Sequence, residues 1–254
     1  MGRVTFMVMR LVVKTNSTPR ASLVGEVFEN LQTVKAKIAE SAFETGRLTE
    51  DIALVAVSKG HDADHVRAAI AAGHRVFGEN RVQEAAEKFR DFRDDPGDLS
   101  VHMVGPLQTN KARQAVAVFD VIQSLDRPRL AAALAREMDI CGRRPTCFIE
   151  VNTGNEKQKS GVSLDSVDRF IEDCRSEYGL PITGLMCIPP SKEEPSLHFA
   201  LLRQLAVRNG LTALSMGMSR DFEVAVAFGA THIRVGTAIF GARPGVVSPY
   251  RVVD

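Results

Sequence analysis

The sequence predicts an α/β protein, a single (β/α)8 barrel of the TIM type with one helix in front of it. Two observations lead to this fold class. Eight short apolar runs recur along the 254 residues, and segments long enough for a helix lie between most of them. Such alternation implies parallel strands joined by right-handed crossovers. Eight almost continuously apolar strands favour closure into a barrel, which routinely reaches this length as one domain. An open, doubly wound sheet is the alternative.

The first expected element is an amphipathic helix over residues 22–45. Apolar side chains recur there at helical spacing, and neither proline nor glycine interrupts residues 26–45. The eight strand-like runs then follow in order: Ile52–Ser58, Arg75–Gly78, Val101–Gly105, Val121–Ser124, Thr146–Asn152, Ile182–Ile188, Ala213–Met216 and His232–Val235. The crossover helices are expected at Ala63–Ala72, Arg81–Phe92, Leu130–Met138, Ser163–Tyr178, Ser196–Arg208 and Arg220–Phe228.

No stretch between Ile52 and Gly241 resembles a linker. We therefore expect one barrel domain over residues 22–243, an N-terminal extension over residues 1–21 and a C-terminal tail over residues 244–254. The extension is basic and free of acidic residues, which resembles a targeting peptide, but Arg10 interrupts its apolar patch. We interpret the extension as a loose segment or as a start codon placed too early.

Composition excludes several classes of function. The net charge is +1, from 32 basic and 31 acidic residues, so no global field attracts nucleic acid or an anionic membrane. No window has the eighteen apolar residues of a spanning helix. The four cysteines lack C-x-x-C spacing and the six histidines lack an H-E-x-x-H pair, which predicts reduced thiols and no metal site. We expect a cytoplasmic monomer.

Lys59 is the first candidate for chemistry. It directly follows the run Ile52–Ser58, so a rigid strand would deliver its amine to the mouth of the barrel, where such folds place their active sites. Burial there lowers the pKa of a lysine and makes a neutral amine available for Schiff-base formation with an aldehyde. The alternative is a strand-end lysine that only extends into solvent.

The ends of the seventh and eighth strands form a candidate phosphate corner. Gly217 and Gly236 would let backbone N–H groups approach an anion, and hydroxyls are available on Ser215, Ser219 and Thr237. This is the usual phosphate-binding corner of the barrel fold. Each glycine taken singly is also explained by turn geometry.

Several motifs together resemble the pyridoxal phosphate homeostasis protein family. They are Ala56-Val57-Ser58-Lys59, the stretch from Phe77 to Glu84, the stretch from His102 to Lys111, the stretch from Val151 to Glu156, Gly184-Leu185-Met186, the stretch from Leu214 to Ser219, and the stretch from Arg234 to Gly241. The match runs in order over about residues 24–243. After Lys59, however, this chain has Gly60-His61-Asp62, where family members often carry a threonine and then a proline.

The resemblance implies a fold like the N-terminal barrel of alanine racemase, with pyridoxal 5′-phosphate held as a Schiff base on Lys59. It implies cofactor contacts from seven further residues. Ser215 and the Gly236-Thr237 turn would hold the phosphate, and Met216 and Gly217 would line the loop beside it. Arg234 would face the pyridine nitrogen, and Asn80 would lie near the ring.

The expected function is that of a carrier without catalytic residues. A permanent cation such as Arg234 at the pyridine nitrogen disfavours ring protonation and makes the ring a poorer electron sink. Racemases also use a tyrosine from an additional domain, whereas only 13 residues follow Gly241 here, and the tyrosines are Tyr178 and Tyr250. We therefore expect buffering and delivery of the cofactor inside the cell, with apo-enzymes as partners. The alternatives are a weak racemase or similar small enzyme, and an interaction protein for which the cofactor is a signal.

Overall fold

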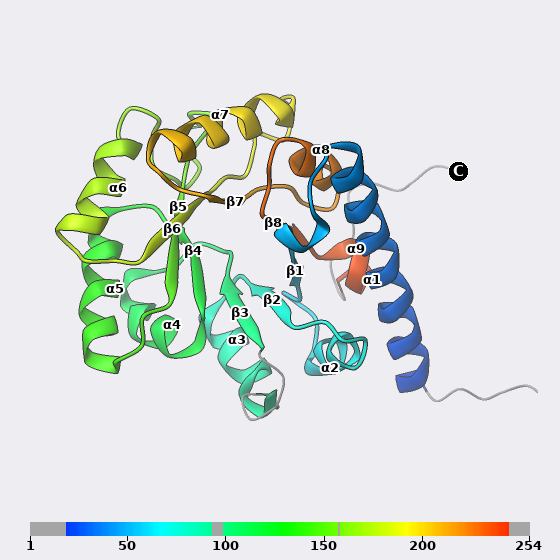
Figure 1. The fold of residues 1–254 in the computed structure, drawn as a ribbon. Helices are drawn as coiled ribbons and strands as arrows, with labels where there is room; N and C mark the ends of the chain where they lie inside the picture. Colours follow the sequence, from blue (N-terminus) through cyan, green and yellow to red (C-terminus); the bar gives the residue numbers. More distant parts are fainter. Residues whose placement is uncertain (1–18, 93–98, 157, 244–254) are drawn as a thin grey trace, which may run out of the picture.

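The computed structural model describes residues 19–92, 99–156 and 158–243, and in these ranges the chain forms the predicted barrel (Figure 1). The strands are parallel and follow the chain order around a closed ring. Their bounds are β1 (Ala53–Val57), β2 (Val76–Glu79), β3 (Ser100–Met103), β4 (Val121–Leu125), β5 (Thr146–Glu150), β6 (Ile182–Met186), β7 (Ala213–Ser215) and β8 (His232–Val235). The eight predicted runs are thereby confirmed, and closure rules out the open sheet.

Helices surround the barrel (Figure 1), with the six expected crossover helices in order and, in the described ranges, two further helices, one between β3 and β4 and one after β8. The helices are α1 (Pro19–Glu44), α2 (Ala63–Ala71), α3 (Val82–Lys88), α4 (Ala112–Val118), α5 (Pro128–Cys141), α6 (Val167–Ser176), α7 (Pro195–Arg208), α8 (Phe222–Ala227) and α9 (Thr237–Phe240). Short 3₁₀ turns lie at Thr49–Asp51, Arg90–Phe92 and Thr109–Lys111. The predicted N-terminal helix is α1. The rest of the predicted extension and the tail lie outside the described residues.

The long helix α1 covers the place where the barrel closes. It packs against α2, α8 and α9, the helices that follow the first, seventh and eighth strands. Its apolar face is buried through Val27, Leu31, Val34 and Ile38, at the spacing that the sequence shows. Burying four such side chains stabilises the seam by several kcal/mol, at about 1.5–3 kcal/mol each.

Local signals fix where individual helices begin and end. The Asp62 side chain accepts from the backbone N–H groups of Asp64 and His65 and so caps α2 directly after the Lys59 loop. Helix α5 begins with Pro128 and ends at Gly142, whose φ of 65° is the left-handed conformation typical of a glycine cap. The Asp62 cap fixes the loop after β1 at the barrel mouth, whereas the Gly142 cap lies at the opposite end, where the chain returns to β5.

Closure of the barrel positions the site. Strand β1 pairs in parallel with β8, in the register Ala53↔His232 to Ala56↔Val235. The loops that leave these two strands at their carboxyl ends are therefore neighbours, although they come from opposite ends of the chain. In the part of the chain that the structure describes, no helix is both long and apolar enough to cross a bilayer.

Candidate functional site

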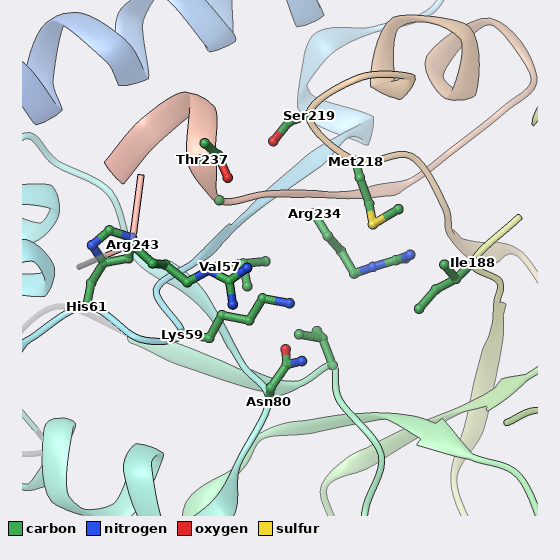
Figure 2. Close-up of a pocket in the computed structure, with 12 residues that line it drawn as sticks. Val57, Lys59, His61, Asn80, Ile188, Met218, Ser219, Arg234, Thr237 and Arg243 are labelled. Atoms are coloured by element: carbon green, nitrogen blue, oxygen red, sulfur yellow. The ribbon is translucent and has the colours of Figure 1, made fainter. Parts of the chain in front are cut away.

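A cavity of about 230 Å³ opens at the carboxyl ends of the strands (Figure 2). It receives residues from the ends of β1, β2, β3, β6, β7 and β8. Its lining includes a lysine, a histidine and two arginines, and the lining residues are Val57, Lys59, His61, Asn80, Val104, Ile188, Met218, Ser219, Arg234, Gly236, Thr237 and Arg243. A cavity at this end of the barrel is where this fold class places its ligands.

The Lys59 side chain reaches into this cavity from the end of β1. Figure 2 shows it pointing toward the space that Arg234 and Arg243 also approach. Burial lowers the pKa of the Lys59 amine, and the nearby Arg243 and Arg234 lower it further, while Glu79 and Glu84 oppose the shift. A lysine with a lowered pKa has a larger neutral fraction at physiological pH, which is the form that attacks a carbonyl.

An ionic cluster lies beneath Lys59 and holds the backbone on both sides of it. The Lys88 ammonium, whose side chain is 5% exposed, donates to Glu79 (2.6 Å), to Glu84 (2.9 Å) and to the Ser58 carbonyl (2.7 Å). The Ser58 hydroxyl donates to the same Glu79 oxygen at 2.7 Å, and the Gly60 N–H donates to Glu84 at 2.6 Å. Residues 58 and 60 are thus fixed, which restricts the direction that Lys59 can take.

A second wall carries Arg234 of β8, which is buried and contacts neutral groups. Its Nη1 donates to the Ser215 hydroxyl at 2.6 Å, and its Nη2 donates to the Cys187 carbonyl at 2.9 Å. The Ser215 hydroxyl in turn lies 2.6 Å from the Gln123 side-chain oxygen. Burial lowers the pKa of the Arg234 guanidinium, with Cys187, Glu150 and Asp221 opposing the shift. The guanidinium remains a cation at neutral pH because the ordinary pKa of an arginine side chain lies far above 7.

Gly236 and Thr237 form the third side, at the junction of β8 and α9. A Cβ atom at Gly236 would lie 3.0 Å from the Val57 carbonyl oxygen, so the close approach of the β8 end to the β1 end favours glycine there. Thr237 is the first residue of α9, and Figure 2 shows its hydroxyl and that of Ser219 on the same side of the cavity. Two hydroxyls and a glycine turn can accommodate a phosphate group.

The structure brings most of the sequence-predicted residues into this cavity. Its lining includes Lys59, Asn80, Arg234, Gly236 and Thr237. Three other predicted residues, Ser215, Met216 and Gly217, are buried behind the lining. Because the Ser215 hydroxyl is shared by Arg234 and Gln123, its contact with a phosphate stays a prediction that this geometry does not favour.

Several lining residues were not among the predicted cofactor contacts. From the loop after β7, the cavity includes Met218 and Ser219. Ser219 carries one of the hydroxyls expected at the phosphate corner, so its signal was present in the motif. His61 is buried, and its Nδ1 has no hydrogen-bond partner within the described residues. Arg243 lies just past α9, where nothing in its local sequence connects it with Lys59.

Glu150 is a further buried acid near the cavity. It ends β5, and burial raises the pKa of its carboxyl group to about 7, with Asp126 acting in the same direction and Arg234 opposing it. It is not part of the lining. No hydrogen bond or ion pair of its side chain is found among the described residues.

Comparisons with known proteins agree with the fold and with the expected family. Residues 30–244 match the family model of the alanine racemase N-terminal domain. The pyridoxal phosphate homeostasis protein of Escherichia coli K12 is 38% identical over 227 residues, which cover 86% of this chain and 97% of that protein. The Pseudomonas aeruginosa protein of the same name is 41% identical over 223 residues, covering 85% and 96%.

Among solved structures, PipY of Synechococcus elongatus PCC7942 superimposes closely. It is 39% identical, covers 85% of this chain and 100% of its own, and has TM-scores of 0.76 without and 0.74 with bound pyridoxal phosphate. The sequence identity, the coverage of both chains and the barrel fold all indicate the same family. This chain therefore belongs to the pyridoxal phosphate homeostasis protein family, whose barrel is that of the alanine racemase N-terminal domain.

Proposed function

We propose that this protein binds pyridoxal 5′-phosphate covalently, as a Schiff base on Lys59, and holds it for delivery to other proteins. The observation that carries the proposal is the Lys59 amine, which has a lowered pKa and shares a cavity with a buried arginine and a hydroxyl-lined glycine turn. Relatives named for this cofactor, and a PipY structure with the cofactor bound, support it.

The residues present fit the chemical groups of the cofactor. Lys59 would meet the aldehyde, and the Gly236-Thr237 turn with Ser219 would hold the phosphate. Arg234, from the neighbouring strand β8, would face the ring nitrogen, and Asn80 would lie beside the ring. The predicted contacts of Met216 and Gly217 would then be indirect, through the loop that carries Ser219. A cavity of about 230 Å³ suits a small cofactor without a large second substrate.

When bound, pyridoxal phosphate supplies an aldehyde for amines and a ring that accepts electrons most readily when its nitrogen is protonated. In this chain Arg234 is a cation with donors only, so it can donate to the unprotonated ring nitrogen but cannot accept from the protonated form, and it opposes protonation there. Lys59 would hold the cofactor and release it to a competing amine. We infer a carrier role inside the cell, with apo-enzymes as the recipients, and no dedicated catalytic step.

The first experiment tests the site. Purified protein is titrated with pyridoxal phosphate, its near-visible absorbance is recorded, and the complex is reduced with borohydride and mapped by mass spectrometry. We expect a Schiff-base band and a reduced adduct on Lys59, both lost in Lys59→Ala. The matched control is Lys111→Ala, because Lys111 lines the neighbouring cavity at the same barrel mouth. An unchanged band in Lys59→Ala contradicts the proposal.

A second experiment separates carrier from enzyme. Loaded protein is mixed with an apo-enzyme that needs this cofactor, in the presence of a trap for free aldehyde, and recovery of the apo-enzyme's activity is followed. Transfer that survives the trap supports delivery. Separately, single amino acids are tested for racemisation, and turnover that disappears in Lys59→Ala would favour a weak racemase instead.

A further inference from the structure

A line of hydrogen-bonded side chains crosses the inside of the barrel and ends at Arg234. From the guanidinium it passes through Ser215 (2.6 Å), then Gln123 (2.6 Å), then His102 Nδ1 (2.8 Å), and His102 Nε2 reaches the Ser100 hydroxyl at 3.0 Å. The strands β7 and β4 are not neighbours in the sheet, so Ser215 and Gln123 meet only because the barrel closes. Both side chains are fully buried.

The order of donors and acceptors along this line is fixed by its first member. Arginine has only donors, so the Ser215 oxygen accepts from Arg234 and its own proton goes to Gln123 Oε1. The Gln123 amide then presents its N–H₂ to His102 Nδ1, which must be the nitrogen without a proton. The remaining N–H of His102 donates to Ser100. Burial lowers the pKa of His102 to about 3, so the ring stays neutral and keeps this order.

We propose that Gln123 is a positioning residue that, through Ser215, holds the Arg234 guanidinium at the cavity wall. On this view Ser215 serves Arg234 and leaves the phosphate to Ser219, Gly236 and Thr237. Among the described residues, Arg234 makes no salt bridge, and its other contact is the Cys187 carbonyl. The neutral line on Nη1 and the Cys187 carbonyl on Nη2 therefore restrict its direction together. The proposal rests on the proposed function, because the group that Arg234 would face is the ring nitrogen of pyridoxal phosphate.

The first test needs no cofactor. In ¹⁵N NMR spectra of the histidine rings, we expect His102 to carry its proton on Nε2 in the wild-type protein. In Gln123→Glu the carboxylate can only accept, so the proton should move to Nδ1. A wild-type His102 protonated on Nδ1 would show that the line runs in another order and would overturn the proposal.

¹⁵N NMR spectra of the arginine side chains report on Arg234 itself, with Arg234→Lys used to assign its signals. In Gln123→Leu the acceptor of the Ser215 proton is lost, and we expect the guanidinium protons of Arg234 to exchange with water roughly three- to tenfold faster. Gln123→Glu should stay within about twofold of wild type, because it still accepts from Ser215. Equal exchange in Gln123→Leu and wild type would rule out positioning. Gln114→Leu, on the exposed face of α4, is the matched control.

The second test is a thermodynamic cycle with two ligands, pyridoxal phosphate and its analogue with C–H in place of the ring nitrogen. We expect Gln123→Leu and Ser215→Ala to weaken binding of pyridoxal phosphate roughly three- to tenfold and binding of the analogue less than twofold. Equal losses for both ligands would contradict the proposal. So would a loss in Ser215→Ala that Gln123→Leu does not share, since it would mark Ser215 as a phosphate contact.

Failure of this inference is distinguishable from failure of the proposed function. If wild-type protein forms no Lys59-dependent band, the proposed function is wrong, and the NMR measurements still decide whether Gln123 holds Arg234. If the band forms and the variants behave as wild type in both tests, only the positioning role is wrong. Unfolding midpoints of each variant show that the folded state is being compared.

Discussion

The wall that carries Lys59 and the wall that carries Arg234 belong to one cavity but are held by different interactions. Beneath Lys59, a buried ammonium from Lys88 is surrounded by two carboxylates and a carbonyl. Beneath Arg234, the contacts are a hydroxyl, a carbonyl and, one step further, an amide. One wall is therefore ionic and the other is built from neutral dipoles.

The difference predicts how each wall responds to change. Removal of one partner from a buried ion pair leaves an uncompensated charge in a medium of low dielectric constant, at a cost of about 3–5 kcal/mol. Removal of a neutral partner leaves an unsatisfied dipole, at a cost of about 1–3 kcal/mol. The Lys59 wall should therefore govern the stability of the barrel mouth, and the Arg234 wall should govern how the mouth meets its ligand.

The largest effect is expected for Lys88→Met. It removes the ion-pair partner of Glu79, which is fully buried, has one oxygen already without a partner and would keep only the hydrogen bond from Ser58. We expect the free energy of unfolding to fall by about 3–5 kcal/mol, measured by urea denaturation. The double variant Glu79→Gln/Lys88→Met should recover part of this loss, because the side chain at position 79 then carries no charge.

Lys37→Met is the surface control for this prediction. Lys37 pairs with Glu223 at 3.1 Å, but both side chains are about half exposed, at 53% and 52%. Its loss should cost at most about 1 kcal/mol. A Lys88→Met variant no less stable than Lys37→Met would show that the ionic cluster gives the Lys59 wall no special stability.

Gly217→Ala should come next, on the Arg234 wall. Gly217 has a φ of 90°, and an added Cβ would lie 2.5 Å from the Ala225 side chain, while the Gly217 carbonyl accepts from the Arg234 N–H at 3.0 Å. Backbone strain and overpacking together predict a loss of roughly 2–4 kcal/mol in unfolding free energy. We also expect weaker cofactor binding, because the same loop carries Ser219.

Gly142→Ala separates these two causes. Gly142 has a φ of 65° at the end of α5, and nothing lies within 4 Å of an added Cβ. It should lose only about 1–2 kcal/mol from backbone strain. Equal losses in the two variants would mean that the contact with Ala225 relaxes freely and that the loop at Gly217 is not tightly packed.

A pH dependence of stability should come from the neutral groups inside the barrel. Burial lowers the pKa of His102 to about 3 and that of His232 from 6.5 to about 4. At pH values above these folded-state pKa values and below the unfolded value of 6.5, the unfolded chain binds protons that the folded protein does not. Stability is therefore lost as the pH falls from about 6.5 toward 4. Each histidine contributes a slope of up to about 1.4 kcal/mol per pH unit.

His232→Asn should reduce the slope of unfolding free energy against pH by up to about 1.4 kcal/mol per pH unit. The slope is measured by urea unfolding at pH 6 and at a lower pH. Glu150 contributes with the opposite sign, because its pKa is raised to about 7 in the folded protein. Its contribution is present below the unfolded value of 4.5 and is lost as the pH rises toward 7. An unchanged slope in His232→Asn would place the titration elsewhere.

The smallest effect is expected for Arg243→Met, which alters the charge near Lys59 without removing a hydrogen bond of the Lys88 cluster or of the line that ends at Arg234. Arg243 lowers the pKa of Lys59, so its removal should raise that pKa. The pH midpoint for the rate of Schiff-base formation should then move upward. The shift is limited because Arg243 is exposed and salt screens its charge. Lys111→Met, at the neighbouring cavity, should leave the midpoint in place.

Sequence reasoning identified the cavity residues that follow directly from strand ends. Lys59, Gly236 and Thr237 each stand next to an apolar run, so periodicity alone places them at the mouth of a parallel barrel. It did not identify Arg243 or Gln123 as part of the site. Gln123 sits inside β4 with an apolar neighbour at Ile122, and no local pattern distinguishes an inward polar residue that meets a partner from β7.

The sequence by itself determined the number and order of the strands, the strand-end position of Lys59 and the family, because these depend on local periodicity and on contiguous motifs. Only the tertiary structure decided which strand ends lie side by side and which side chains form hydrogen bonds with each other. Closure of β1 against β8 brings the Lys59 loop next to the Gly236 turn, and closure also turns Ser215 toward Gln123. These contacts join residues far apart in the chain, where burial and hydrogen-bond geometry decide the pairing and no local pattern records it.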